Sequence, residues 1–226
     1  MSNYSYNTNM QGAFNALEKF SPPPVIAATP ATVVVPAPAV VEKTNKILPP
    51  TEGFFLLDLA CGDRKTENHI GIDIAKTEST DYVYDLTQFP WPIDDGVVDG
   101  IVCNHFFEHL TGPQRMQFMD EVWRVLKMGS QITIIVPYWS SMRAIQDPTH
   151  QWPPVCEASF AYFNKKWRDE NKLSHYPINC HFEFTYGYAV DADLAVRNQE
   201  WQAFAIKHYI QAINDLQVTL TKTEIK

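Results

Sequence analysis

The stretch from Leu57 to Lys65 (LDLACGDRK) decides the fold of this chain. It is typical of a buried strand that carries an acidic residue and runs into a turn of small residues. Ala60 and Gly62 have little or no side chain, so the turn lets a ligand lie against the backbone. Open α/β sheets bind ligands at the carboxyl ends of their strands, so the stretch predicts a ligand site at which Asp58 orients the ligand or accepts from an ammonium group.

Short apolar runs separated by turn or helix signals follow this stretch, which is the pattern of an α/β sheet. Only about nine residues separate the first two expected strands, so the first helix is expected to shrink to a turn or less. Leu216, Val218 and Leu220 alternate with polar residues, as in an exposed edge strand. We predict a doubly wound, mostly parallel sheet with an antiparallel edge strand. The expected strands are residues 54–59, 69–74, 81–86, 99–104, 131–137, 182–190 and 216–221, and the expected helices are residues 112–127, 157–171 and 193–209.

The N-terminal quarter differs from this pattern in composition. Residues 21–50 hold eight of the sixteen prolines, and no charged residue occurs from Ser21 to Val41. Repeated proline fixes φ and removes amide donors, so this segment is expected to be extended and unable to form a packed core. A helix over residues 11–20 would be marginal in water. We predict a disordered arm over residues 1–50 and one domain over residues 51–226, with a substrate-side insertion at about residues 138–177.

The composition argues against several classes of protein. A formal net charge of -8 disfavours duplex nucleic acid as a partner, because its phosphates are bound by clustered cations. The four cysteines form no Cys-x-x-Cys pair, so neither a disulfide framework nor a zinc knuckle is indicated. No apolar run reaches the roughly 18 residues of a membrane span, and the N-terminus lacks the basic region of a secretory signal. A cytoplasmic protein is expected.

Three acidic residues end three successive expected strands. After Asp58, Asp73 closes the second strand, where a carboxylate can accept both hydroxyls of a ribose. Asp85 closes the third strand, where it can accept from an adenine amino group while the Leu86 amide reaches a ring nitrogen. Three acids therefore stand where such a ligand could be bound.

Over residues 54–138 the chain resembles the class I S-adenosylmethionine-dependent methyltransferases, in particular the group called methyltransferase type 11. Asp58 to Gly62 resembles that family's first motif, Asp73 its ribose-binding acid, and Asp85 with Leu86 its adenine contact. The run Asp99 to Leu110 (DGIVCNHFFEHL) resembles its fourth strand and the helix start that follows. The run Val125 to Ser130 (VLKMGS) resembles its Leu-Lys-Pro-Gly-Gly turn.

The resemblance implies a Rossmann-like fold, S-adenosyl-L-methionine as the cofactor, and in-line displacement in which an unidentified acceptor attacks the sulfonium methyl group. Lys65 or Arg64 is expected to neutralise the carboxylate of the cofactor. The residues implied for cofactor binding are Asp58, Ala60, Cys61, Gly62, Lys65, Asp73, Ile74, Asp85, Leu86 and Asn104.

The first turn departs from the family pattern, because Ala-Cys-Gly-Asp stands where many members have a second or third glycine. The departure also argues against a nicotinamide-dependent dehydrogenase, which needs Gly-x-Gly-x-x-Gly for the close approach of a pyrophosphate. Met128 and Ser130 replace the usual proline and glycine of the later turn. The main alternative is a non-catalytic binding or scaffold protein with this fold, tethered to a protein partner through its proline-rich arm.

The segment His105 to His109 (HFFEH) matches the His-x-x-Glu-His signature of some zinc peptidases, whose two histidines share a metal. It directly follows a buried strand, and no third ligand at the family's spacing is apparent in the sequence. We therefore predict no metal. The backbone of Asn104 and His105 is expected to line the cofactor, and Glu108 and His109 are expected to be structural.

A catalytic base is needed only if the acceptor carries a proton, and three residues are candidates. Asp147 and His150 belong to an Asp-Pro-Thr-His turn soon after the strand that is expected to face the methyl group. Similar turns accompany the methyltransferase group that the chain resembles, although Asp-Pro also begins turns for steric reasons alone. His105 is the third candidate. The aromatic residues of the insertion are expected to be mostly core.

Overall fold

The computed structural model describes residues 46–224. Nearly all of the predicted arm, including the expected helix over residues 11–20, lies outside the described residues. Ile47 packs in the hydrophobic core and donates its amide to the carbonyl of Pro92, so the packed domain begins before residue 51, the boundary expected from composition. Within residues 46–224, no helix has the length and apolar character needed to cross a membrane.

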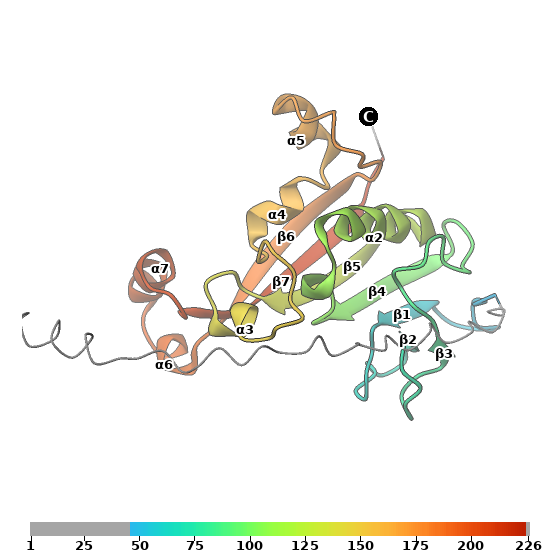
Figure 1. Ribbon diagram of the computed structural model, residues 1–226, viewed down its shortest axis with the longest axis horizontal. Coiled ribbons are helices and arrows are strands. Elements are labelled where there is room, and N and C mark those ends of the chain that lie inside the picture. Colours follow the sequence, from blue (N-terminus) through green and yellow to red (C-terminus); the bar gives the residue numbers. More distant parts are fainter. Residues whose placement is uncertain (1–45, 225–226) are drawn as a thin grey trace, which may run out of the picture. The chain divides into compact units, whose positions relative to one another are not determined.

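One seven-stranded sheet organises the domain, in the order β3-β2-β1-β4-β5-β7-β6 (Figure 1). Strands β1 to β5 are parallel, and β7 is antiparallel to both of its neighbours. The predicted α/β sheet, mostly parallel with antiparallel pairing at one edge, is confirmed. The strands are β1 Leu56–Leu59, β2 Ile70–Asp73, β3 Tyr82–Val83, β4 Val98–Asn104, β5 Leu126–Pro137, β6 Phe182–Val190 and β7 Ile213–Lys222.

The prediction that residues 216–221 form the outer edge is wrong, because β7 lies between β5 and β6, and β6 is the outer strand. Leu216, Val218 and Leu220 are fully buried, whereas Thr219 is partly exposed beside Thr133 of β5, with 3.3 Å between their hydroxyl oxygens. The alternation therefore reflects a strand with one face in the core, which a central antiparallel strand shows as clearly as an edge strand does.

Helix α2 is the longest helix among the described residues, and it packs its apolar face against the sheet beside β5 (Figure 1). It begins after Thr111, whose amide donates to the side chain of Gln114. It ends at Val125, and β5 follows without a loop, so Gly129 lies inside β5 at a positive φ rather than stopping the helix. The helices are α2 Gly112–Val125, α3 Met142–Ile145, α4 Glu157–Ala161, α5 Lys165–Glu170, α6 Ala192–Ala195 and α7 Gln199–His208, with a 3-10 turn, η1, at Phe107–His109.

Two of the predicted helices are interrupted by asparagines that start a new helix. The expected helix over residues 157–171 divides into α4 and α5 at Asn164, whose side chain accepts from the amide of Trp167 at 3.0 Å. The expected helix over residues 193–209 divides into α6 and α7 at Asn198, which accepts from the amide of Trp201 at 2.9 Å. Asparagine competes with the backbone for hydrogen bonds, so it favours a helix start over a helix interior.

The connections between β1, β2 and β3 contain no helix, so the first helix is not merely shortened but replaced by turns. These turns are held close to the sheet by Gly71 on β2. A Cβ atom on Gly71 would lie 2.6 Å from the carbonyl oxygen of Ser79 and 2.8 Å from the sulfur of Cys61. Only a residue without a side chain lets both turns pack on β2 at this distance.

Gly71→Ala is therefore expected to lower the free energy of unfolding by about 1 to 3 kcal/mol, because the methyl group must displace backbone. Gly187→Ala is the matched control: Gly187 also lies in a strand, and a Cβ there would meet nothing within 4 Å. Urea unfolding of both variants measures the difference. Equal stability of the two variants would show that the turns do not depend on the close approach at β2.

Candidate functional site

Two adjoining pockets lie at the carboxyl ends of β1, β2 and β4, and Ala60 lines both of them. We name them the Asp58 pocket, of about 480 Å³, and the Asp73 pocket, of about 300 Å³. The Asp58 pocket is lined by Asp58, Ala60, Cys61, Asp63, Arg64, Asn104, His105 and Ile135. The Asp73 pocket is lined by Ala60, Asp73, Ile74, Tyr84, Asp85, Leu86, Thr87, Phe106, His109, Leu110 and Gln114.

The backbone around these pockets is unusual. Ala60, directly after β1, has a φ of 56°, and His105, directly after β4, has a φ of 55°. Non-glycine residues rarely adopt positive φ, and those that do concentrate at functional sites. Strands β1 and β4 are neighbours in the sheet, with β2 beyond β1 and β5 beyond β4. The pockets therefore lie where the strand order reverses, which is where open α/β sheets bind ligands.

Asp58 and Asp73 hold the turn between β1 and β2. Asp58 is 2% exposed and accepts from the amide of Thr66 at 2.6 Å. Asp73 accepts from the amide of Gly62 at 2.9 Å through one oxygen and from the amide of Ala75 at 2.8 Å through the other. A carboxylate has about four acceptor positions, so Asp73 keeps two for a ligand.

Asp85 is held in a turn after β3. One of its oxygens accepts from both the amide and the hydroxyl of Thr87, and the other accepts from the side chain of Gln88 at 3.2 Å. Burial raises the pKa of Asp85, but the hydrogen bonds from Thr87 and Gln88 outweigh it, and the net effect lowers the pKa. Asp85 therefore brings a fixed negative charge to the Asp73 pocket.

Cys61 lines the Asp58 pocket but is largely buried. Burial raises the pKa of its thiol, and the negative charges of Asp58 and Asp73 raise it further. The sulfur therefore stays protonated at neutral pH, and Cys61 contributes an apolar wall.

Of the two cations expected near a ligand carboxylate, the structure brings Arg64 to the pocket and not Lys65. Arg64 lines the Asp58 pocket. Lys65 pairs with Asp81, with 2.6 Å between its nitrogen and the carboxylate oxygen. The same oxygen of Asp81 accepts from the amide of Gly71 at 2.7 Å, so Lys65 is tied to the turn structure behind β2.

The three candidate bases do not occupy one place. His105 lines the Asp58 pocket, and its Nδ1 lies 3.5 Å from a carboxylate oxygen of Glu108, which raises the pKa of His105 despite burial. Asp147 and His150 line neither pocket. His150 instead packs its ring against that of His109, with 4.7 Å between the ring centroids. Only His105 is therefore placed against the Asp58 pocket.

Part of the chain is similar in sequence to a known protein family. Residues 51–134 match the model of a family described as a methyltransferase domain, and this segment contains β1 to β4 and the acids of both pockets. Over these residues the chain is similar to that family. The resemblance seen in the sequence is thereby confirmed. No curated protein matches the chain in sequence.

Solved structures resemble this chain at low sequence identity. An S-adenosylmethionine-dependent methyltransferase from Archaeoglobus fulgidus is 17% identical with a TM-score of 0.50, over 75% of this chain and 86% of that chain. One from Mesorhizobium loti is 13% identical with a TM-score of 0.45, over 77% of this chain and 94% of that chain. A chain from the Haloferax volcanii complex that contains the Trm112 methyltransferase activator is 15% identical with a TM-score of 0.47, over 79% of this chain and 86% of that chain. The first of these likenesses shows a shared fold.

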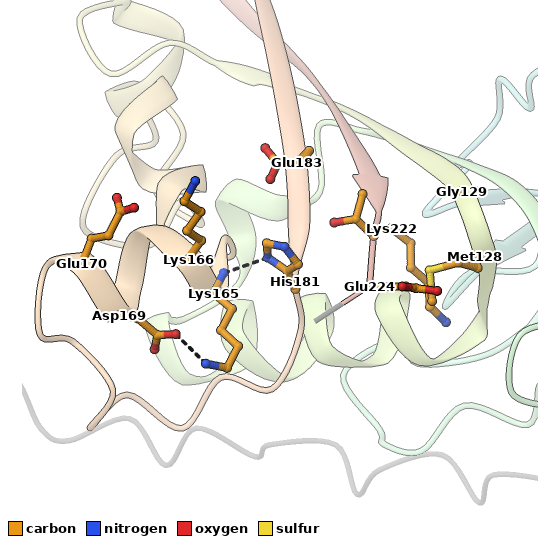
Figure 2. Close-up of a pocket in the computed structure, with 11 residues that line it drawn as sticks. Met128, Gly129, Lys165, Lys166, Asp169, Glu170, His181, Glu183, Lys222 and Glu224 are labelled. Atoms are coloured by element: carbon orange, nitrogen blue, oxygen red, sulfur yellow. Dashed lines mark hydrogen bonds and ion pairs between the residues drawn. The ribbon is translucent and has the colours of Figure 1, made fainter. Parts of the chain in front are cut away.

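A larger pocket, of about 670 Å³, lies at the other end of the sheet, near the start of β6 and the end of β7 (Figure 2). Two of its lysines already have partners within the protein. Lys165 pairs with Asp169, and its amide donates to the ring of His181, while Lys222 donates to the carbonyl of Leu126. The carboxyl ends of the parallel strands lie away from it, so we place the ligand site at the two smaller pockets.

Several residues that line the two pockets carried little signal in the sequence. Tyr84 directly precedes Asp85 at a strand end, so its position beside a predicted ligand contact is a signal that could have identified it. Gln114 shows no such signal, because its side chain already caps α2. Arg64 and His105 were expected near the cofactor, and the other lining residues absent from the predicted cofactor set are Asp63, Tyr84, Thr87, Phe106, His109, Leu110, Gln114 and Ile135.

Arg115 of α2 connects the segment after β4 to the turn that carries His150. It is 8% exposed, and its guanidinium donates to four backbone carbonyls. Two belong to Phe107 and Glu108, and two belong to Gln151 and Pro153. We call this arrangement the Arg115 clasp. The amide of Gln151 also donates to the carbonyl of Glu108 at 2.9 Å.

Arg115→Met is expected to lower the free energy of unfolding by about 2 to 4 kcal/mol, because several buried carbonyls lose their donor. Amide hydrogen exchange at Gln151 should become faster as its segment detaches. Lys165→Met is the control, since the Lys165 and Asp169 side chains are 39% and 51% exposed and their ion pair at the surface contributes at most about 1 kcal/mol. Protection of Gln151 that is unchanged in Arg115→Met would contradict the clasp.

Proposed function

We propose that the chain is an S-adenosylmethionine-dependent methyltransferase that binds its cofactor across the two pockets that meet at Ala60. One observation carries the proposal. Asp58, Asp73 and Asp85 line two pockets that share Ala60 at the strand ends, inside the segment that matches the methyltransferase domain model.

The chemistry of the two pockets fits the two ends of this cofactor. The amino acid end carries an ammonium and a carboxylate, and the Asp58 pocket offers a buried carboxylate together with Arg64. The adenosine end carries two hydroxyls and an amino group, which are donors, and the Asp73 pocket offers two carboxylates. Both volumes fall within the roughly 300–1,000 Å³ of small-molecule sites.

We assign the ribose hydroxyls to Asp73, whose two oxygens each keep one acceptor position after binding the turn. Asp85 accepts from the adenine amino group, and the Leu86 amide donates to a ring nitrogen. Asp58 accepts from the ammonium group, and Ala60 and Gly62 let the ligand lie against the backbone. Ile74, which is 70% exposed, would be covered by the adenosine.

When bound, the cofactor supplies a methyl group on a sulfonium that is already activated for displacement. The contribution of the protein is alignment, which can lower a barrier by roughly 7 to 11 kcal/mol. The strained backbone at Ala60 and His105 fixes the walls of the Asp58 pocket on either side of the strand reversal. His105 is the candidate base that borders this space, and it is needed only for an acceptor that carries a proton.

Asp73→Asn is expected to weaken the binding of S-adenosylhomocysteine at least about tenfold, because one charged hydrogen bond contributes roughly 1.5 to 3 kcal/mol. Isothermal titration measures the affinity. Asp94→Asn is the matched control, since Asp94 is exposed, pairs with Lys46 and lines neither pocket. Circular dichroism establishes that both variants are folded. An unchanged affinity in folded Asp73→Asn would refute the ribose assignment.

The reaction is tested by a screen that measures S-adenosylhomocysteine release from S-adenosylmethionine with acceptors of different chemical classes. We expect turnover with at least one class. If the full chain binds no S-adenosylmethionine at millimolar concentration, the proposal is wrong. Binding without turnover on any class would instead favour the scaffold alternative.

A further inference from the structure

Glu108 is a buried carboxylate whose oxygens have no hydrogen-bond partner among the described residues. Its side chain is 6% exposed, and neither Oε1 nor Oε2 accepts a hydrogen bond. The nearest cation, His105 Nδ1, lies 3.5 Å from Oε1, which is beyond the usual length of a hydrogen bond. Arg115 donates to the backbone carbonyl of Glu108 and not to its carboxylate. Burying a carboxylate without hydrogen bonds costs free energy, so a bound cation would stabilise Glu108 in this position.

Two histidines meet this carboxylate. One ligand atom each from Glu108, His109 and His150 lie within 4.8 Å of one another. Glu108 and His109 come from η1, and His150 comes from a turn that is distant in sequence. The Arg115 clasp holds the two segments together, since it binds the carbonyls on both sides.

The hydrogen bonds of His150 leave one ring nitrogen ready to bind a cation. Its Nδ1 lies 3.1 Å from the carbonyl oxygen of Ala144. A carbonyl only accepts, so Nδ1 carries the proton and Nε2 of the neutral ring keeps its lone pair. A metal-binding histidine typically donates its other nitrogen to a carbonyl or carboxylate in this way.

The same argument holds for His109 through Thr149. The hydroxyl of Thr149 donates to Asp147 at 2.6 Å, so it accepts from Nδ1 of His109 at 3.0 Å. Nδ1 of His109 therefore carries the proton, and Nε2 keeps its lone pair. Asp147 and Thr149 thus orient a histidine, although the turn that carries them lines neither pocket.

We propose that Glu108, His109 and His150 bind one divalent transition-metal ion. One carboxylate and two imidazoles are a donor set that suits zinc and its neighbours in the first transition series. Ligand atoms around tetrahedral zinc lie about 3.3 Å apart, so the cluster closes by small side-chain movements. Three protein ligands leave a position for water or for an oxygen or nitrogen of a bound molecule. The ion would also offset the buried charge of Glu108, whose oxygens accept no hydrogen bond.

The sequence argued against a metal because no third ligand was apparent, and the structure supplies that ligand. The His-x-x-Glu-His pattern suggests that His105 and His109 are the pair, with no third ligand in sight. In the structure His105 has a positive φ and lines the Asp58 pocket, while Glu108 takes its place as a ligand and His150 completes the set. The site goes beyond the proposed methyl transfer, because Glu108 and His150 line neither cofactor pocket, and His109, which borders the Asp73 pocket, has no assigned contact with the cofactor.

The test uses the full chain without a histidine tag, first treated with a chelator. We expect it to bind one equivalent of Zn²⁺ by isothermal titration and to retain one equivalent by elemental analysis after desalting. Glu108→Gln and His150→Asn should each weaken this binding more than about tenfold. His175→Asn is the control for adventitious binding to exposed histidines, and it should bind as the unmodified chain does.

Thr149→Val keeps the test decisive if Glu108→Gln does not fold. It removes only the hydroxyl that orients His109, so zinc affinity should fall about 10 to 100-fold, as it does when outer partners of a ligand are lost. No stoichiometric zinc, or equal zinc binding in all four variants, would overturn the proposal. Titration of S-adenosylhomocysteine into the chelated chain separates this result from the cofactor proposal, since each ligand is measured without the other.

Discussion

One buried guanidinium, that of Arg115, holds together the two segments that carry the proposed metal ligands. Arg115 donates to the carbonyls of two segments that are more than forty residues apart along the chain, and no helix or strand joins those segments directly. A charged group that is 8% exposed is stable only when its donors are used, and backbone carbonyls use four of them here. The clasp therefore acts as a substitute for secondary structure, and it sets the position of the turn that bears His150.

Asp58 and Asp73, at the carboxyl ends of β1 and β2, both shape the loops and are available to a ligand. In many nucleotide-binding folds a helix N-terminus follows the first strand and presents free amides to the ligand. This domain has turns in that place, and Asp58 and Asp73 bind the amides of those turns themselves. The acids thus shape the loops before any ligand arrives. Ligand recognition then depends on the acceptor positions that the loops leave unused.

The sequence was sufficient for the parts of the structure that local patterns determine. The strands up to β5, the long helix after Gly112 and the acids at three strand ends were recognised because strand periodicity and strand-end position are local properties. The order of β6 and β7 was not recognised, because alternating apolar and polar residues show that one face of a strand is buried but do not show which strands lie beside it. The place of His150 was also hidden, because it follows from the hydrogen bonds of Arg115 across the fold. Lys65 and Arg64 are adjacent and equally charged, so only the ion pair with Asp81 separates their roles.

Cys61 lies in the wall of the Asp58 pocket, where the proposed reaction would place a sulfonium within reach of a sulfur nucleophile. A thiolate there would compete with the true acceptor and alkylate the protein itself. Only the deprotonated sulfur is strongly nucleophilic, and burial together with Asp58 and Asp73 raises the pKa of this thiol. The charges that attract the methyl donor would therefore also protect the protein from its own reagent.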